Sequence, residues 1–169
     1  VLKVGDHCFD NCTNLSAANL YGVNSDGNTS LQQIGDGLFY NCTALKQISL
    51  PDNLTSMNTM KDVFNNCSSL DYICLSKNAA TGDTINHTNF TGCSSLVTVK
   101  VPSKNLKFEC SHAGGSVDAL APANLGAYTA FPTSFTLPDE FVIMGYNASE
   151  AHTYALHENH QLSFCYLDA

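Results

Sequence analysis

The chain has 169 residues and a mass of 18.1 kDa, which is enough for one domain or for one stack of short repeats. A hydrophobic fraction of 44% can supply a sizeable core, whereas only 13% of the residues are charged, about half the usual share. Fifteen acidic residues against seven lysines give a net charge of −8, which argues against nucleic acids and anionic membrane surfaces as partners. No apolar run approaches 18 residues, so no membrane insertion is expected.

A spaced triplet, Phe-x-x-Cys-x-x-Leu, recurs along the first part of the chain. Asn precedes Cys in three copies, and Ser or Thr follows Cys in all four. The Phe residues lie 30, 25 and 26 positions apart, and both Phe and Cys are uncommon, so the copies indicate internal repeats rather than coincidence. The copies are Phe9-Cys12-Leu15, Phe39-Cys42-Leu45, Phe64-Cys67-Leu70 and Phe90-Cys93-Leu96.

Each copy continues into an alternation of apolar residues that is typical of a short strand. The alternating pairs are Ile48 and Leu50, Ile73 and Leu75, and Val99 and Val101, with a weaker Ala18 and Leu20 in the first copy. We therefore expect parallel strands near Lys46–Leu50, Asp71–Leu75 and Val97–Val101, about 4.8 Å apart in one sheet. One repeat cannot bury its apolar face alone, so the Phe, Cys and Leu of each motif are expected in a shared core. The remainder of each repeat is short and contains Gly, which favours turns or short 3₁₀ segments.

Residues 103–169 depart from this period. Phe135–Phe141 is similar to Ile48–Leu54, which predicts a further, degenerate repeat there. Asn147–Glu150 offers capping residues for a helix, and Leu162–Leu167 alternates weakly as a strand. The end of a stack of repeats exposes its core, so we interpret this tail as a cap.

The repeats resemble the BspA-like leucine-rich repeats of microbial surface proteins. The match is almost complete from Ile34 to Pro51, IGDGLFYNCTALKQISLP, and it extends to the core positions of residues 4–102. The family usually has Ala at four positions that are here Cys8, Leu38, Val63 and Asn89. The resemblance implies a secreted or cell-surface protein that binds other macromolecules, and it implies no catalytic site.

The fold expected from the repeats and from this resemblance is a leucine-rich-repeat solenoid, a β-rich α/β right-handed superhelix. A parallel sheet forms one side, turns or short 3₁₀ segments form the other, and a C-terminal cap closes the end. We divide the chain into residues 1–102, which hold four leucine-rich repeats, and residues 103–169, which hold the degenerate repeat and the cap.

The motif cysteines are the most conspicuous reactive side chains. A catalytic thiol needs an exposed, electropositive setting, and four equivalent copies favour buried small apolar side chains instead. The sequence leaves two modifications undecided. One is a disulfide between Cys110 and Cys165 that would tie down the tail, and the other is N-glycosylation of sequons such as Asn41-Cys-Thr. Turn chemistry also explains these sequons, because Asn favours bends.

Candidate binding residues lie between the inward positions of the strands, where the alternation turns them toward solvent. The second outward residue of each strand forms a central row, and the first flanks it. The row is short and its residue types are mixed, so they do not indicate which ligand it binds. No cofactor or metal is expected. The six candidates are Gln47, Ser49, Tyr72, Cys74, Thr98 and Lys100.

Our leading hypothesis is a non-enzymatic binding or adhesion module, secreted or at the cell surface, that recognises a protein or another extracellular macromolecule. A structural spacer within a longer surface protein is the first alternative. A metal-dependent hydrolase is the second, because the tail holds the densest group of ligand-type side chains. This group comprises Glu150, His152, His157, Glu158 and His160, and a polar helix face explains it more simply.

Overall fold

A computed structural model describes residues 3–21, 31–54, 57, 60–81, 83–109, 142–146, 149 and 163–167 of the chain. These residues form short strands, all paired in parallel, and one 3₁₀ helix, η1 (His87–Phe90). The strands are β1 (Lys3–Val4), β2 (Gln33–Ile34), β3 (Gln47–Ser49), β4 (Tyr72–Cys74), β5 (Thr84–Asn86), β6 (Thr98–Val101), β7 (Lys107–Glu109), β8 (Val142–Gly145) and β9 (Ser163–Tyr166).

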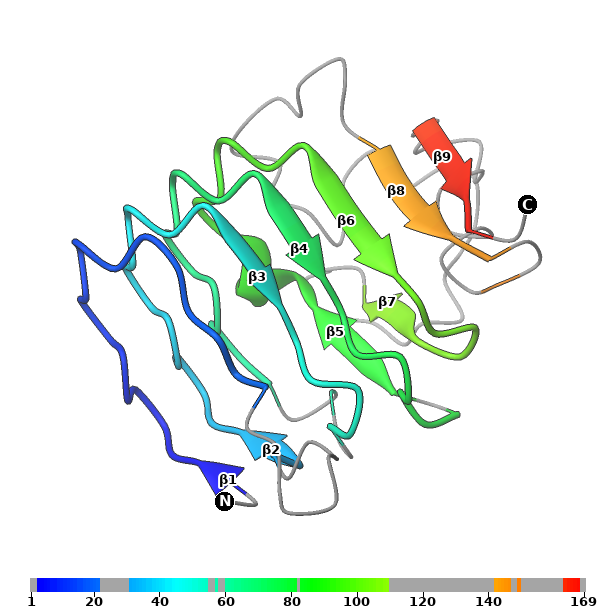
Figure 1. The fold of residues 1–169 in the computed structure, drawn as a ribbon, viewed down its shortest axis with the longest axis horizontal. Helices are drawn as coiled ribbons and strands as arrows, with labels where there is room; N and C mark the ends of the chain where they lie inside the picture. Colours follow the sequence, from blue (N-terminus) through cyan, green and yellow to red (C-terminus); the bar gives the residue numbers. More distant parts are fainter. Residues whose placement is uncertain are drawn as a thin grey trace, which may run out of the picture.

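The main sheet has the strand order β3-β4-β6-β8-β9, and Figure 1 shows these strands side by side across one side of the molecule. Ile48 pairs with Ile73, and Ile73 pairs with Val99, so equivalent positions of successive repeats stand next to each other. The three strands expected from the alternation are therefore confirmed, as is their adjacency in one parallel sheet.

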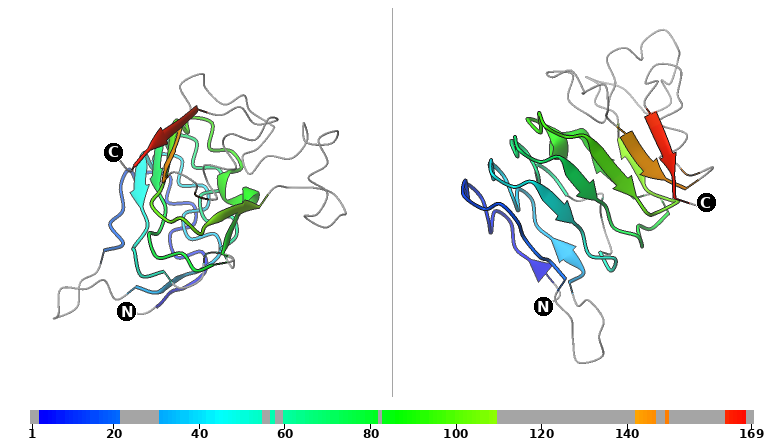
Figure 2. Two further views of the ribbon diagram at one scale, coloured as in Figure 1. Left: turned by 90° about the vertical axis from the view of Figure 1, so that its right-hand side faces the viewer. Right: turned by 45° about the horizontal axis from the view of Figure 1, so that its top comes forward.

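Two small sheets, β1–β2 and β5–β7, lie on the other side of the repeats (Figures 1 and 2). The sequence predicts turns or short 3₁₀ segments there, and η1 is such a segment, but the paired strands go beyond that prediction. The cause is a second inward position, five residues before the motif Phe. Val4 packs against the core, and Ile34 and Ile85 are buried, so the segments that carry them straighten and pair.

The core contains a column of stacked Phe rings, one from each repeat. The centroids of Phe9, Phe39, Phe64 and Phe90 follow one another at 5.5, 6.3 and 6.5 Å. The last three rings are fully buried, which confirms the predicted inward face. Phe9 is 37% exposed, because among the described residues it has a stacking partner on one side only.

The motif cysteines form a second buried column, and their thiols donate weak hydrogen bonds. Each Sγ–H reaches the carbonyl oxygen of the motif Phe in the preceding repeat, in the pairs Cys42–Phe9 at 3.0 Å, Cys67–Phe39 at 3.1 Å and Cys93–Phe64 at 3.1 Å. These three side chains are fully buried, which confirms the interpretation as small core residues for them, whereas Cys12 of the first repeat is half-buried. The bonds add a link between successive repeats.

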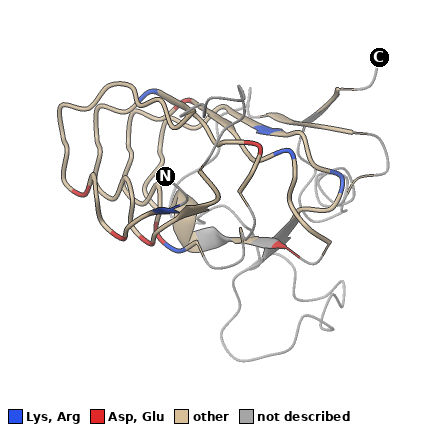
Figure 3. Ribbon diagram, turned by 60° about the horizontal axis from the view of Figure 1, so that its bottom comes forward, with Lys and Arg blue, Asp and Glu red and all other residues tan. Residues whose placement is uncertain are grey.

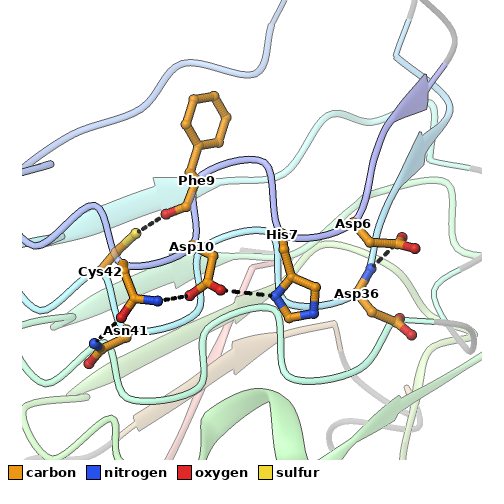
Figure 4. A network of polar contacts seen from close by, with 8 residues as sticks. Asp6, His7, Phe9, Asp10, Asp36, Asn41 and Cys42 are labelled. Carbon is orange, nitrogen blue, oxygen red and sulfur yellow. Dashed lines mark hydrogen bonds and ion pairs between the residues drawn. The ribbon is translucent and has the colours of Figure 1, made fainter.

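The bend before each motif Cys requires a left-handed residue. Asn11, Asn41 and Asn66 have φ angles of 57°, 57° and 61°, and Gly92 takes the same place at 77°. The Asn side chains form a ladder, in which Nδ2 of Asn41 donates to Oδ1 of Asn11 and Nδ2 of Asn66 donates to Oδ1 of Asn41, both at 2.6 Å. Figure 4 shows this region of the first two repeats. Turn chemistry thus accounts for the Asn of these sequons.

Backbone hydrogen bonds link the successive bends, as where Phe39 N–H donates to Val63 O at 2.9 Å and Asn66 N–H donates to Thr91 O at 2.6 Å. The fourth repeat also contacts the third through a buried side chain, that of Asn89 in η1. Here Oδ1 of the fully buried Asn89 accepts the Val63 N–H at 3.0 Å, while its Nδ2 donates to the Met60 carbonyl at 3.0 Å. Both ends of the amide are paired, so a buried polar side chain is tolerated where η1 tightens the chain.

The strands β8 and β9 continue the main sheet beyond the fourth repeat. β8 pairs with β6 and β9 pairs with β8, and Ile143 of β8 is fully buried opposite Val99. The strand expected within Leu162–Leu167 is confirmed by β9. The degenerate repeat expected at Phe135–Phe141, and most of the helix expected after Asn147, lie outside the described residues.

Candidate functional site

The register of the main sheet aligns its outward residues in two rows. All six candidate residues lie in these rows, at the relative positions that the alternation predicts. The first row, which we call row 1, is Gln47, Tyr72, Thr98 and Val142, and row 2 is Ser49, Cys74, Lys100, Met144 and Cys165. Adjacent strands are about 4.8 Å apart, so an extended ligand that crosses the strands can contact several members of a row.

The exposure of the strand residues follows the same alternation. The inward Ile48, Ile73 and Val99 are at most 2% exposed. Their outward neighbours in β3, β4 and β6 are half-buried, and Gln47 is exposed. The outward face of these strands is therefore accessible to a ligand while its backbone is held rigidly by the core.

The two rows carry little charge. Lys100 is their one basic residue, and they contain no acidic residue. Burial raises the pKa of the Cys74 thiol, and the nearby Lys100 opposes that shift. Burial also raises the pKa of Tyr72, so this hydroxyl stays protonated near neutral pH. Figure 3 shows how few acidic and basic positions the described ribbon has. The face is therefore suited to hydrogen bonding and apolar contact rather than to ion pairing.

Two apolar members of the rows, Val142 and Met144, were not predicted. They stand on either side of the buried Ile143 in a continuous apolar run that begins at Phe141. Alternation is invisible in such a run, so the sequence does not separate inward from outward positions there. Only the pairing of β8 with β6 assigns these two side chains to the face.

A shallow pocket of about 300 Å³ lies at the N-terminal end of this face. Ala17 forms an isolated parallel bridge with Gln47, so the first repeat extends row 1 beyond β3. Asn19 and Tyr21 of the first repeat border the pocket together with Gln47 and Tyr72. The pocket thus spans the first three repeats and includes members of the predicted rows.

Asn19 and Tyr21 were not predicted as site residues. The signal for Asn19 was present, because the inward Ala18 and Leu20 place it at the position of Ser49 in the next repeat. Tyr21 has no such signal, since it follows the last alternating residue. Its hydroxyl donates to the Leu50 carbonyl at 2.8 Å, which turns its ring toward the second repeat.

Polar contacts on the bends are structural. His7 Nδ1 lies 3.4 Å from Asp10 Oδ2, and Oδ1 of Asp6 accepts the Asp36 N–H at 3.1 Å (Figure 4). Across the described ranges, no three His, Cys, Asp or Glu side chains are grouped to hold a metal ion. The histidines and glutamates of the tail lie outside those ranges.

The described cysteines are all free, including Cys165 of β9, and Cys110 lies outside the described residues. The one helix in the part of the chain that the structure describes is the four-residue η1, and no helix there has the length and apolarity to cross a bilayer.

Comparison with curated proteins and with solved structures gave no significant match. Among family models, the one described as "BspA type Leucine rich repeat region (6 copies)" matches residues 1–112 of the 169. The matched span contains all four copies of the motif, both core columns, and the strands β1 to β7. The recurring residues, their stacking in register and the family match agree, and the chain belongs to the BspA-type leucine-rich repeat family.

Proposed function

We propose that this chain is a non-enzymatic binding or adhesion module, secreted or at a cell surface, whose outward sheet face recognises a protein or another extracellular macromolecule. The observation that carries the proposal is the pair of accessible rows, held in register by a buried core. Family membership supports it, because BspA-like repeats resemble those of microbial surface proteins. The net charge of −8 disfavours nucleic acid as the partner.

The proposal includes the path of the chain. The repeats wind as a right-handed solenoid, and residues 103–169 cover its C-terminal end. The extension of the main sheet by β8 and β9 supports the covering role, since these strands bury the edge of β6. A covered end is what a stack of repeats requires for solubility.

Surface plasmon resonance with the immobilised full chain and a panel of extracellular matrix proteins tests the proposal. Lys100→Glu reverses the one charge in the two rows, whereas Lys61→Glu makes the same chemical change on a bend. We expect the row variant to weaken binding about tenfold or more, as interface centres typically do, and the bend variant to bind as the parent does.

Two results would contradict the proposal. Equal binding of both variants would remove the outward face from the recognition surface. Absence of binding across the panel, with the chain folded, would favour the structural spacer. Elemental analysis of the purified chain examines the hydrolase alternative, which requires about one bound metal ion per chain.

A further inference from the structure

The pocket at the N-terminal end of the face has a distinctive lining. Two phenol rings, Tyr21 and Tyr72, border it. The rest of the lining consists of three uncharged polar residues and two apolar ones: Asn19, Gln47, Ser49, Ala18 and Ile48. Its volume of about 300 Å³ is at the lower end of pockets that hold small molecules. The occupant is therefore one small unit rather than an extended segment.

The polar groups of the pocket are oriented by the fold. Oδ1 of Asn19 accepts the Tyr21 N–H at 2.8 Å, which fixes the amide and directs its Nδ2 donor group elsewhere. The Tyr21 hydroxyl is held by the Leu50 carbonyl. Gln47 and Ser49 belong to β3, whose inward side chain, Ile48, is anchored in the core. The Asn19 amide and the Tyr21 ring therefore need little reordering when a ligand arrives, which lowers the entropic cost of binding.

The lining excludes most classes of ligand by its chemistry. It contains no Lys, Arg or His for an anion and no carboxylate for a cation. Burial raises the pKa of both Tyr21 and Tyr72, so both phenols are neutral near pH 7. A purely apolar occupant would form no hydrogen bonds with the carboxamides of Asn19 and Gln47, which are exposed polar groups of the lining.

One ligand class satisfies the whole lining. Carboxamides and hydroxyls both donate and accept hydrogen bonds, so they match groups that do both, namely alcohols. A pyranose ring carries several hydroxyls at its rim and a face of C–H bonds, whose slightly positive hydrogens are attracted to the negative face of an aromatic ring. A neutral sugar thus pairs with the amides and packs on the phenol rings at the same time.

We propose that the pocket formed by Asn19, Tyr21, Gln47, Ser49 and Tyr72 binds one uncharged pyranose unit of a glycan. This inference rests on the proposed binding function and specifies the chemistry of the partner, a neutral glycan presented by a glycoprotein or a polysaccharide. Rows 1 and 2 run away from the pocket toward β9, so the remainder of the partner lies across them.

Saturation-transfer difference NMR with the full chain tests the proposal directly. The probes are methyl β-galactopyranoside and methyl β-glucopyranoside, with glucuronate as a charged comparison. We expect saturation of the ring C–H protons of at least one neutral probe, and a weaker signal from glucuronate. Titrations followed by amide chemical shifts then give the dissociation constant for each variant.

The paired variants are Tyr72→Ala in the pocket and Tyr40→Ala, which removes an exposed ring on a bend away from the pocket. Loss of a stacked ring is expected to raise the dissociation constant about tenfold, and Tyr40→Ala is expected to leave it unchanged. Gln47→Ala, at an exposed position, is expected to weaken binding without touching the core. If circular dichroism shows that Tyr72→Ala is unfolded, Gln47→Ala still tests the proposal.

Absence of saturation transfer to both neutral probes, or an unchanged dissociation constant in Tyr72→Ala and Gln47→Ala, would overturn the sugar assignment. The proposed function is judged separately. A matrix protein that binds the parent and loses affinity for Lys100→Glu, in the absence of sugar binding, supports the function and rejects the pocket. Sugar binding without any macromolecular partner supports the pocket and rejects the function.

Discussion

At the scale of single residues, the environment of the motif thiols favours the protonated form, whereas a nucleophilic cysteine needs an environment that favours the thiolate. Burial raises the pKa of Cys67 to about 12 and raises that of Cys93 as well. Each thiol donates to a carbonyl, which also requires the proton to be present. At neutral pH the thiolate population is negligible, so these side chains are inert packing groups with a directional bond.

The shifted pKa makes stability depend on alkaline pH. A thiol whose pKa is about 12 in the folded chain and 9.0 in the unfolded chain contributes its full stabilisation below pH 9. That contribution falls between about pH 9 and pH 12, because only the unfolded chain releases the proton there, with a slope of about 1.4 kcal/mol per pH unit. Urea unfolding across this range measures it.

Cys67→Ser is the matched control, since Ser keeps a donor for the Phe39 carbonyl and does not titrate in this range. The two proteins share every other side chain, so the difference between their slopes reports on the Cys67 thiol. Identical slopes for Cys67→Ser and the parent would show that Cys67 is not protected by the fold.

The Phe column predicts that the loss of stability on substituting a motif Phe by Ala depends on how deeply that Phe is buried. Phe64 is fully buried between Phe39 and Phe90, so Phe64→Ala is expected to cost about 3–5 kcal/mol in free energy of unfolding. Phe9→Ala is expected to cost clearly less, because 37% of Phe9 is already exposed. Lys61→Ala, on the surface, should stay within about 0.5 kcal/mol. Equal denaturation midpoints for Phe64→Ala and Lys61→Ala would refute the inward assignment.

At the scale of elements, neighbouring repeats touch so closely at the bends that some positions cannot carry a side chain. Gly5 and Gly35 are equivalent residues of the first two repeats. A Cβ on Gly35 would lie closer than 3.0 Å to the backbone nitrogen of Asp6 and the carbonyl carbon of Gly5, whereas a Cβ on Gly5 would find Cys8 Sγ at 3.7 Å. The difference arises because the second repeat has a neighbour on that side within the described chain and the first does not.

We therefore expect opposite outcomes from one substitution at two equivalent sites. Gly35→Ala should destabilise the chain by about 1–3 kcal/mol, the usual range for overpacking against atoms that cannot move freely. Gly5→Ala should be neutral within about 0.5 kcal/mol. Thermal melts of the two variants and the parent measure the contrast. A larger loss at Gly5 than at Gly35 would contradict the stacking of the first two bends.

Some elements could be predicted from sequence because their signal is repeated. The strands β3, β4 and β6 each place one apolar residue between polar neighbours after an anchoring Leu, and three copies of the pattern support one another. β1 and β2 have only two residues each, which is too short for any periodicity. β8 lies in a run of apolar residues, so its register comes from pairing with β6 and not from its own pattern.

The candidate site could likewise be predicted only in part. The outward positions of the six candidate residues could be predicted, because alternation determines which side chains leave the core. The pocket could not, since it depends on Tyr21, whose position is set by a hydrogen bond to Leu50, 29 residues further along the chain. Contacts between repeats, rather than the pattern within one repeat, create that part of the surface.

At the scale of the whole molecule, the division between repeats and tail is open to a truncation test. We expect residues 1–102 alone to aggregate or to melt far below the full chain. Without β8, the edge of β6 and the apolar surface around Val99 would face water. At about 25 cal/mol per Å² over a few hundred Å², that exposure costs several kcal/mol, comparable with the net stability of a domain.

Residues 103–169 alone are expected to be largely unfolded, because β8 and β9 would lack the sheet that they extend. Circular dichroism melts of both fragments and of the full chain decide the matter. Two separate cooperative transitions, each matching part of the full-length melt, would show two independent domains and not a stack with a cap.

The hydrogen bonds between repeats run along the stacking direction, as the strand pairing and the Cys and Asn contacts show. β1 and β9 lie at opposite ends of the stack (Figure 1). Tension applied between the two ends therefore pulls these bonds open along their length, one interface at a time, rather than shearing all of them together. Each repeat contacts only its neighbours, so a released turn leaves the others intact. We expect such a chain to yield in small steps and to recoil when the load is removed, so that the stack extends gradually under tension.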